Sequence, residues 1–467
     1  MGGLLVTTAV GANVVLTEAE VATFKAGVRG PLLRPGEACY EETRHVWNGL
    51  IDRRPALIAR CTGVADVIQC VQFARAHALL VSVRGGGHNI PGNAVCDGGL
   101  MIDLALMKGI RLDPTRRTIR AEGGVTWREF DHETQAFGLA TTGGAVSDTG
   151  IAGLTLGGGL GWLAGSYGLA CDNLLAVDLV TADGSFLTVS TGAHPDLFWG
   201  VLGGGGNFGV VTSFAYQLHP VGPVLAGRLL YPIAQATEVL KCYRDFSCAI
   251  PDTVNTIGGL ATIPDGTKVV AILICYHGPR AAGERVLRPL RSLGSPLVDE
   301  IRPRPYQEAQ TLLDAASPRG RRYYVKAAFV EAISDAAIET LIDHFVAAPS
   351  PFSHLSFQQL GNAARRVPPE ATAFYHRGAM YEWFVQAAWL DPADDAPNIH
   401  WSRATAAAMA PFTTRRGYVN HLGPETMEGM EPIRTAYGPN YDRLVALKNR
   451  YDPTNLFRLN PNIKPTV

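Results

Sequence analysis

Residues 84–89 read Arg-Gly-Gly-Gly-His-Asn and directly follow an apolar segment, LLVSV, at residues 79–83. Two more glycine clusters lie downstream, GGAVSDTGIAGLTLGGGLGW at 143–162 and GGGGNFG at 203–209, and the second runs into an expected strand. Consecutive glycines let successive backbone N–H groups point into one concavity, which suits phosphate oxygens. Three such clusters beside strands therefore predict a long phosphate-bearing ligand held by backbone amides.

The glycine clusters do not fit the common nucleotide-binding motifs. No Gly-Lys-Ser/Thr follows any of them, so a P-loop is excluded. None is a strand–GxGxxG–helix opening with an acidic residue about 20 positions later, which argues against a nicotinamide-binding Rossmann unit. The plainer alternative is that the clusters are tight turns in a glycine-rich chain, with 51 glycines in 467 residues.

Composition limits the class of protein. The chain has 41 Lys and Arg against 42 Asp and Glu, a net charge of −1, and 47% hydrophobic residues. This balance argues against a nucleic-acid-binding protein, which usually needs a basic face, and against a disordered chain. The length predicts two to three domains.

We expect a cytoplasmic protein without a metal site. The eight cysteines form no CxxC pair and mostly lie in apolar runs, which favours reduced, buried thiols. No segment reaches the roughly 18 apolar residues of a membrane helix, and the N-terminal segment has no basic region typical of an export signal.

The distribution of glycine clusters and of alternating segments along the chain predicts three regions, at residues 1–220, 221–410 and 411–467. The first holds the glycine clusters and alternates short strands with helices such as residues 64–79. The second alternates apolar and polar residues in VNTIGGLATI, KVVAILICYHG, YYVKAAFV, HLSFQQLG and MYEWFVQAAW, with helical stretches between them. We therefore predict an α+β fold in which a mostly antiparallel sheet is backed by helices. The third region ends in DPTNLFRLNPNI and is expected to pack back on the first.

The order of these motifs resembles a known family. RGGGHN, DGGLMIDL, TGIAGLTLGGGLGWLAGSYGLACDNL, DLFWGVLGGGGNFGVVT and DPTNLFRLNPNI are similar to segments of the FAD-linked oxidases of the vanillyl-alcohol-oxidase and p-cresol-methylhydroxylase superfamily. The closer likeness is to the berberine-bridge-enzyme branch and its bacterial 6-hydroxy-D-nicotine-oxidase-like members. The resemblance spans nearly the whole chain. It implies a two-part FAD-binding domain (1–220), a substrate domain (221–410) and a C-terminal segment that returns to the FAD-binding domain (411–467).

The resemblance implies which residues contact FAD. In the family, the histidine of the first loop carries a covalent bond to the flavin 8α-methyl group, and here that residue is His88. Some members add a cysteine link at the position of Val146, so a single link is expected. Cys171 is interpreted as a core residue. The expected cofactor contacts are Arg84, Gly85, Gly86, Gly87, His88, Asn89, Gly143, Ser147, Asp148, Thr149, Gly150, Gly153, Leu154, Gly157, Gly158, Gly161, Val211 and Asn462.

Catalytic candidates are polar residues within apolar strands of the second region. Such a strand sends alternate side chains into a pocket, so one face of the sheet can meet the substrate. The alternative is that this face is exposed to solvent and that these residues are only hydrated. The candidates are Tyr324 and Lys326 on one strand, Gln359 on the next, and Glu382 and Gln386 on the last.

The segment GYVNH matches the Tyr-x-Asn-Tyr segment that borders the active site in relatives. Tyr418 and Asn420 keep the pattern, whereas His421 replaces the second tyrosine. A histidine can serve as a base or as an orienting group, which puts the usual tyrosine role in doubt. His376 and Arg377 are expected to be structural.

Thr149 corresponds to a position beside the flavin C4a–N5 edge in relatives. Its hydroxyl can hold an oxygen there, as in a related flavin-N5-oxide oxygenase branch, or the side chain can simply fill space. The leading hypothesis is a covalent FAD oxidase that takes a hydride from a small or medium organic substrate and reduces O₂. The alternatives are an oxygenase acting on a polyketide-like or aromatic substrate, and a module that only binds a redox-active molecule. A monomer or homodimer is expected.

Overall fold

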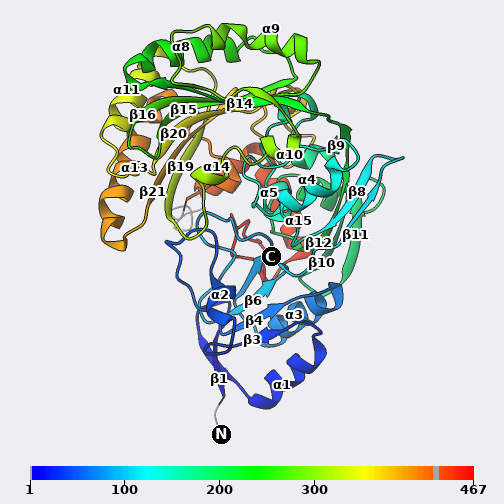
Figure 1. The fold of residues 1–467 in the computed structure, drawn as a ribbon. Helices are drawn as coiled ribbons and strands as arrows, with labels where there is room; N and C mark the ends of the chain where they lie inside the picture. The colour runs from blue at the N-terminus through cyan, green and yellow to red at the C-terminus, as the bar shows by residue number, and fades with distance from the viewer. Residues whose placement is uncertain (1–2, 424–430) are drawn as a thin grey trace.

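The computed structural model describes residues 3–423 and 431–467. Within these residues, the strands form one large sheet, two smaller sheets and two two-stranded pairs. Figure 1 shows the large sheet at one end of the molecule, the four-stranded sheet at the other, and the five-stranded sheet between them at one side. This arrangement confirms the predicted α+β class.

The N-terminal part contains a four-stranded sheet with a parallel centre. Strand β6 lies between β4 and β5 and pairs in parallel with both, while β3 pairs antiparallel with β4. The helices α1 (Glu18–Gly27) and α3 (Val64–Ala76) pack on one face, with Phe24, Val67 and Cys70 in the shared core. The strands are β3 (Leu32–Leu33), β4 (Leu57–Arg60), β5 (Val81–Arg84) and β6 (Leu100–Asp103).

A five-stranded antiparallel sheet follows, in the order β11-β10-β12-β8-β7. Helices α4 (Trp127–Gln135), α5 (Ile151–Leu156) and α7 (Pro195–Val201) contribute to its hydrophobic core. The glycine clusters form the connections next to these strands and helices. The strands are β7 (Ile110–Asp113), β8 (Thr118–Glu122), β10 (Leu174–Thr181), β11 (Phe186–Ser190) and β12 (Gly209–Gln217).

The large sheet is antiparallel throughout and has the order β17-β14-β16-β15-β20-β21-β19, with β18 (Arg302–Arg304) beside β14. All five strands that were predicted from sequence alternation pair in it. Strand β14 was not predicted, because its apolar run is too continuous to show alternation. The other strands are β14 (Val224–Pro232), β15 (Val254–Thr262), β16 (Lys268–Tyr276), β17 (Val298–Asp299), β19 (Arg322–Val330), β20 (His354–Gln359) and β21 (Tyr381–Trp389).

Four long helices pack on one face of the large sheet (Figure 1). They are α8 (Ala236–Ser247), α9 (Arg280–Arg291), α11 (Asp335–Val346) and α13 (Asp395–Met409). Alternate residues of β21 separate the two faces: Tyr381, Trp383 and Val385 join the core under these helices, whereas Phe384 packs with Trp47 and Tyr323 on the other side. On that opposite face, which looks toward the N-terminal part of the chain, the short helix α10 (Tyr306–Ala309) packs against β14.

The C-terminal segment packs against the glycine-rich part. After α14 (Glu431–Tyr437) and α15 (Tyr441–Tyr451), the amide of Asn460 donates to the carbonyl of Gly206 at 3.1 Å. The side chain of Asn207 donates to the carbonyl of Pro461 at 3.3 Å and accepts from the backbone N–H of Ile463 at 3.0 Å. The tail is thus tied to the third glycine cluster. The remaining short elements are β1 (Leu4–Thr7), β2 (Asn13–Leu16), α2 (Tyr40–Arg44), β9 (Leu139–Ala140), α6 (Ala164–Tyr167), β13 (His219–Pro220), α10 (Tyr306–Ala309) and α12 (Asn362–Arg366).

Candidate active site

The RGGGHN loop offers a row of backbone donors. Among the described residues, no backbone N–H of residues 85–89 donates to a protein acceptor. The loop also lies directly against the second glycine cluster, because a Cβ atom added to Gly86 would stand 2.3 Å from the backbone nitrogen of Gly150. Glycine is therefore required for the two loops to meet. Unpaired N–H groups in series are the donors that a pyrophosphate needs.

Arg84 anchors this loop. Its guanidinium forms two hydrogen bonds with the buried Asp103, at 2.8 and 2.6 Å, and donates to the backbone carbonyl of Thr43. Arg60 contacts the same carboxylate from the other side at 3.3 Å. The Arg84 side chain is therefore engaged within the protein, so its expected cofactor contact is indirect, through the position of Gly85 and Gly86.

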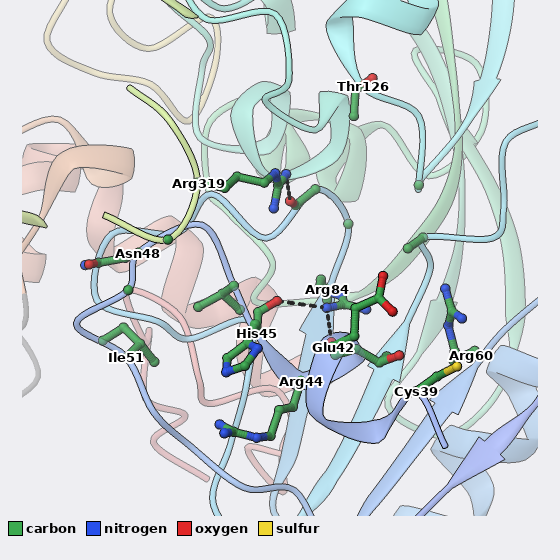
Figure 2. Close-up of a pocket in the computed structure, with 18 of the residues that line it drawn as sticks. Cys39, Glu42, Arg44, His45, Asn48, Ile51, Arg60, Arg84, Thr126 and Arg319 are labelled. Carbon is green, nitrogen blue, oxygen red and sulfur yellow. Dashed lines mark hydrogen bonds between the residues drawn. The ribbon is translucent and has the colours of Figure 1, made fainter. Parts of the chain in front are cut away.

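A cavity of about 880 Å³ adjoins the start of the loop (Figure 2). It is bordered by Arg84, Gly85 and Gly86, by the segment around His45, and by Arg319. His88, Glu382 and His421 do not line it. This cavity therefore lies beside the phosphate-type loop and apart from the polar residues described next.

Three groups lie close to His88. Its Nε2 is 2.9 Å from Oδ1 of Asp148 but forms no hydrogen bond among the described residues. Its Nδ1 lies 3.5 Å from the hydroxyl of Thr149, and the indole of Trp47 stacks on the ring with centroids 5.1 Å apart. Burial lowers the pKa of His88, and the nearby carboxylate of Asp148 only partly opposes this. The imidazole is therefore neutral at neutral pH.

The second glycine cluster holds the backbone close to the C-terminal segment. Gly159 has a φ of +92°, and its N–H donates to the Tyr418 hydroxyl at 2.8 Å. The side-chain amide of Asn420 donates to the carbonyl of Leu154 at 3.0 Å and to the Tyr418 hydroxyl at 2.7 Å. A Cβ atom on Gly157 would overlap Asn420. Tyr418 and Asn420 thus contact the backbone of the glycine run.

Glu382 and His421 form a pair on the face of the large sheet opposite α8, α9, α11 and α13. Oε1 of Glu382 lies 2.8 Å from Nδ1 of His421, and the carboxylate is 1% exposed. Among the described residues, the other oxygen of Glu382 has no hydrogen-bond partner, and neither has the amide nitrogen of Gln386 on the same strand face. His421 also packs edge-on against Tyr418, with ring centroids 5.0 Å apart.

Tyr324 and Lys326 do not join this pair. Strand β19 turns both toward the helix layer, where the Tyr324 hydroxyl accepts from Nε of Arg403 on α13 at 3.1 Å. The Lys326 ammonium lies 5.7 Å from the Tyr324 ring, and burial together with Arg403 lowers its pKa. Both residues were expected to be catalytic because they are polar residues within an apolar strand. Sequence alternation cannot tell which face of the sheet carries the helices, and these two residues lie on the face opposite to Glu382.

The same ambiguity affects the two adjacent glutamines of β20. Gln359 points to the helix layer, where its amide donates to the carbonyl of Ser247 at 3.0 Å. Gln358 alternates to the other face and is paired in register with Glu382 of β21 and Ile257 of β15. Gln358 is therefore the glutamine beside the candidate site, one residue before the one expected from the sequence.

The remaining expected contacts are distributed along the glycine-rich part. A Cβ atom on Gly153 would meet nothing within 4 Å, so space is open there. Among the described residues, the side-chain oxygen of Asn462 is buried without a partner. Val211 lies in β12, and a Cβ atom on the neighbouring Gly123 would stand 2.8 Å from its carbonyl. Gly143, Gly158 and Gly161 pack closely against Trp127, Phe374 and the backbone of Gly143, respectively.

His376 and Arg377 are engaged within the protein fold. Arg377 is 1% exposed and forms two hydrogen bonds with Asp172, at 2.6 and 2.7 Å, while His376 contacts the carbonyl of Thr435 at 2.9 Å. Cys171, next to Asp172, is buried in the core, and burial raises the pKa of its thiol. The eight cysteines are all unpaired.

Two kinds of feature are missing from residues 3–423 and 431–467. No group of three or more His, Cys, Asp or Glu side chains there is arranged to hold a metal ion. In the same residues, no helix combines the length and apolar character needed to cross a membrane.

The unpaired backbone N–H groups of the first glycine loop fit a dinucleotide cofactor, whose two halves are joined by a phosphate bridge. The backbone N–H groups of residues 85–89 are unpaired among the described residues, space is open at Gly153, and the side-chain oxygen of Asn462 is buried without a partner there. The fold and this site together define a flavin-dependent oxidoreductase.

Comparisons with known proteins agree with the assignment to the flavin-dependent oxidoreductases. Residues 55–190 match the family described as FAD binding domain, and residues 418–464 match the family described as berberine and berberine like. A FAD-linked oxidoreductase of Dictyostelium discoideum is 33% identical over 450 residues, covering 95% of this chain and 97% of that protein. An (R)-6-hydroxynicotine oxidase of Paenarthrobacter nicotinovorans is 32% identical over 463 residues, covering 94% and 97%.

A solved structure shares the whole fold. The crystal structure of 6-hydroxy-D-nicotine oxidase from Arthrobacter nicotinovorans superimposes with a TM-score of 0.85 at 30% identity, covering 94% of this chain and 98% of that one. This chain therefore belongs to the FAD-linked oxidoreductases of the berberine-bridge-enzyme family, and FAD is its cofactor. The resemblance inferred from the sequence is confirmed.

Several residues of the site were missed from the sequence. Gln358 was missed, because the adjacent Gln359 was expected at the site instead. Trp47, Asp314 and Arg319 gave no local signal, because each reaches the site from a segment far away in the chain. Only tertiary structure brings these segments together.

Proposed function

We propose that this protein is an oxidase that carries FAD covalently on His88, takes a hydride from a small or medium organic substrate, and is reoxidised by O₂. The observation that carries the proposal is the Glu382–His421 pair beside the glycine run. FAD, when bound, supplies the hydride acceptor and delivers the electrons to O₂. The residues of the chain supply orientation and proton transfer.

His421 is the proton acceptor in this scheme. A carboxylate at Nδ1 holds the ring proton there and leaves the lone pair on Nε2. Among the described residues, Nε2 of His421 contacts no other polar group. It is therefore free to take the proton of a substrate hydroxyl or amine while the hydride leaves the adjacent carbon.

Other polar groups on the same sheet face orient the substrate. The free oxygen of Glu382, the amide nitrogen of Gln386 and the partly exposed Gln358 offer one acceptor and further amide groups. Phe384, whose ring centroid is 5.0 Å from that of His421, supplies an apolar wall. These groups suit a substrate with a flat or apolar body and at least one hydroxyl or amine.

Tyr418 and Asn420 position the segment that carries His421. They bind the backbone at Gly159 and Leu154 and so set the distance between His421 and the glycine run. We also propose domain boundaries at 1–220, 221–410 and 411–467, a cytoplasmic location, and a monomer or homodimer. The eight unpaired cysteines support the location.

The function is tested by mixing the purified enzyme with a substrate panel under anaerobic conditions and following the flavin absorbance. The panel comprises hydroxylated N-heterocycles, chosen because one relative is a hydroxynicotine oxidase, and secondary alcohols, sugars and amines. We expect one class to bleach the flavin and air to restore it with formation of H₂O₂. Flavin that no member of the panel bleaches, or that air does not reoxidise, would contradict an oxidase.

The second candidate is an oxygenase, and the hydroxyl of Thr149 favours it because it can hold an oxygen near the flavin. Turnover under ¹⁸O₂ separates the two: an oxidase places the label only in peroxide, and an oxygenase places it in the organic product. Thr149→Val keeps the volume and removes the hydroxyl, so it would abolish labelled product only in the oxygenase.

A further inference from the structure

Three polar residues alternate along β20 on the face of the large sheet that carries the candidate site. In the strand HLSFQQ, Leu355 and Phe357 join the core under the long helices. His354, Ser356 and Gln358 therefore lie on the opposite face. All three are partly exposed, and among the described residues none of their side chains forms a hydrogen bond. They form a row of polar groups that can bind a ligand.

The ring of Phe384 connects this row with the proposed proton acceptor, His421. The centroid of the Phe384 ring lies 5.0 Å from that of His421 and 5.9 Å from that of His354. His421 pairs with Glu382, which precedes Phe384 on the same face of β21. His354 lies opposite Gln386, which follows Phe384 on that face. The two imidazoles therefore flank Phe384, and a flat ring that packs on it reaches His421 with one end and His354 with the other.

Arg321 brings a positive charge to the His354 end of this face. The next residue, Arg322, binds Asp395 of α13 on the helix face, so Arg321 is directed to the opposite face. The central carbon of its guanidinium lies 4.1 Å from the ring centroid of Phe352, which precedes β20. Because β21 separates β19 from β20, the Arg321 side chain crosses the end of β21. Burial and, second, the charge of Arg321 lower the pKa of His354 to about 4, so the two groups lie close together.

The Arg321 guanidinium has no counter-ion within residues 3–423 and 431–467. It donates one long hydrogen bond, from Nη1 to the carbonyl of Ala316 at 3.5 Å, and its Nε is buried without a partner. Gln386, directly opposite His354, is 3% exposed, and its amide nitrogen also lacks a partner among the described residues. Buried donors without acceptors cost free energy, which a ligand that supplies acceptors would recover.

We infer that Arg321, His354 and Gln386 form the carboxylate-binding end of the substrate site. This inference rests on the proposed oxidase and adds its substrate class: an alcohol or amine with a flat apolar body and a carboxylate at the end remote from the oxidised carbon. The guanidinium supplies the charge, and the imidazole and the amide supply further N–H donors to the carboxylate oxygens. Phe384 supports the body, and His421 meets the reacting end.

The test compares two ligands of nearly equal shape, p-toluate and p-toluamide, which differ in charge. Neither carries a hydroxyl or amine that the oxidase would use, so calorimetry with the full-length, flavin-loaded protein reports binding alone. In the wild type, p-toluate should bind at least about tenfold more tightly than p-toluamide, because only the carboxylate accepts hydrogen bonds between opposite charges.

Variants assign this preference to the three residues. Arg321→Gln and His354→Leu should bring the ratio of the two affinities close to one, whereas Arg321→Lys, which keeps the charge, should retain most of it. Arg322→Gln is the matched control, because the adjacent guanidinium binds Asp395 at 2.6 and 2.5 Å on the other face of the sheet. It should keep the wild-type ratio. The ratio is measured within each variant, so a smaller folded fraction does not change it.

Four results would overturn the inference: no detectable binding of either ligand to the wild type, equal affinities for the two, a preference that persists in Arg321→Gln, or an equal loss of preference in Arg322→Gln. Failure of the proposed oxidase has a different signature. A protein that prefers p-toluate as expected, but whose flavin no member of the substrate panel reduces, would refute the oxidase and support the carboxylate-binding end.

Discussion

At the scale of single residues, two histidines of the candidate site each lie beside a carboxylate. Oε1 of Glu382 lies 2.8 Å from Nδ1 of His421, and Oδ1 of Asp148 lies 2.9 Å from Nε2 of His88. Glycine motifs located His88 in the sequence, but the partner of each histidine could not be predicted, because no local pattern links positions 39 residues or more apart.

Replacement of His421 tests its role as proton acceptor. His421→Phe keeps an aromatic ring against Tyr418 but removes both nitrogens, so flavin reduction by substrate should slow by about 10²–10⁴. Glu382→Gln should slow it less, since an amide oxygen can still accept from Nδ1. Stopped-flow reduction across pH provides the measurement.

The pH profile distinguishes catalysis from packing. The pH dependence of the reduction rate should differ between the wild type and His421→Phe, because the variant lacks the proton-accepting nitrogen. If the variant kept both the rate and the pH dependence of the wild type, His421 would not be the base.

At the scale of elements, the large sheet decides which side chains meet the substrate. Alternation in the sequence predicted the strands β15, β16, β19, β20 and β21, but it did not say which face carries the helices. For β21 the expected residue Glu382 is on the site face. For β19 the expected residues Tyr324 and Lys326 are on the helix face, because α13 packs there.

The adjacent glutamines of β20 give a matched test of this register. Gln358→Leu should raise KM several-fold and leave the free energy of unfolding within about 0.5 kcal/mol of the wild type. Gln359→Leu should leave KM unchanged and cost about 1–3 kcal/mol, because the buried carbonyl of Ser247 loses its donor. Steady-state kinetics and urea unfolding of both variants provide the comparison. A raised KM in Gln359→Leu together with a loss of stability in Gln358→Leu would mean that the two faces of β20 are assigned the wrong way round.

At the scale of the whole molecule, the C-terminal segment locks the glycine-rich part together. The ammonium of Lys448 is fully buried and contacts Asp452 at 2.7 Å, the carbonyl of Asn207 at 2.9 Å and the carbonyl of Phe457 at 2.9 Å. The sequence motif DPTNLF indicated a packed tail. It gave no indication of the buried ion pair, because a Lys at four residues from an Asp is usually a surface pair.

Removal of this buried ion pair should weaken both the packing of the C-terminal segment and the binding of FAD. Lys448→Met leaves the Asp452 carboxylate buried without its counter-ion and should cost about 3–5 kcal/mol. Arg434→Met is the control: it removes an exposed pair with Asp442 in the same segment and should cost no more than about 1 kcal/mol. Thermal unfolding and flavin content of both variants are the readouts. Equal losses in the two variants would contradict a locking role.

The covalent link at His88 is the central claim of the proposed oxidase, and peptide mapping tests it most directly. The purified protein is digested, and the flavin-containing peptide is identified by its absorbance and its mass. The account predicts one such peptide, containing His88 and heavier by FAD less two hydrogens, and none in His88→Ala. Flavin that separates entirely from the denatured protein, or that maps to a cysteine, would contradict it.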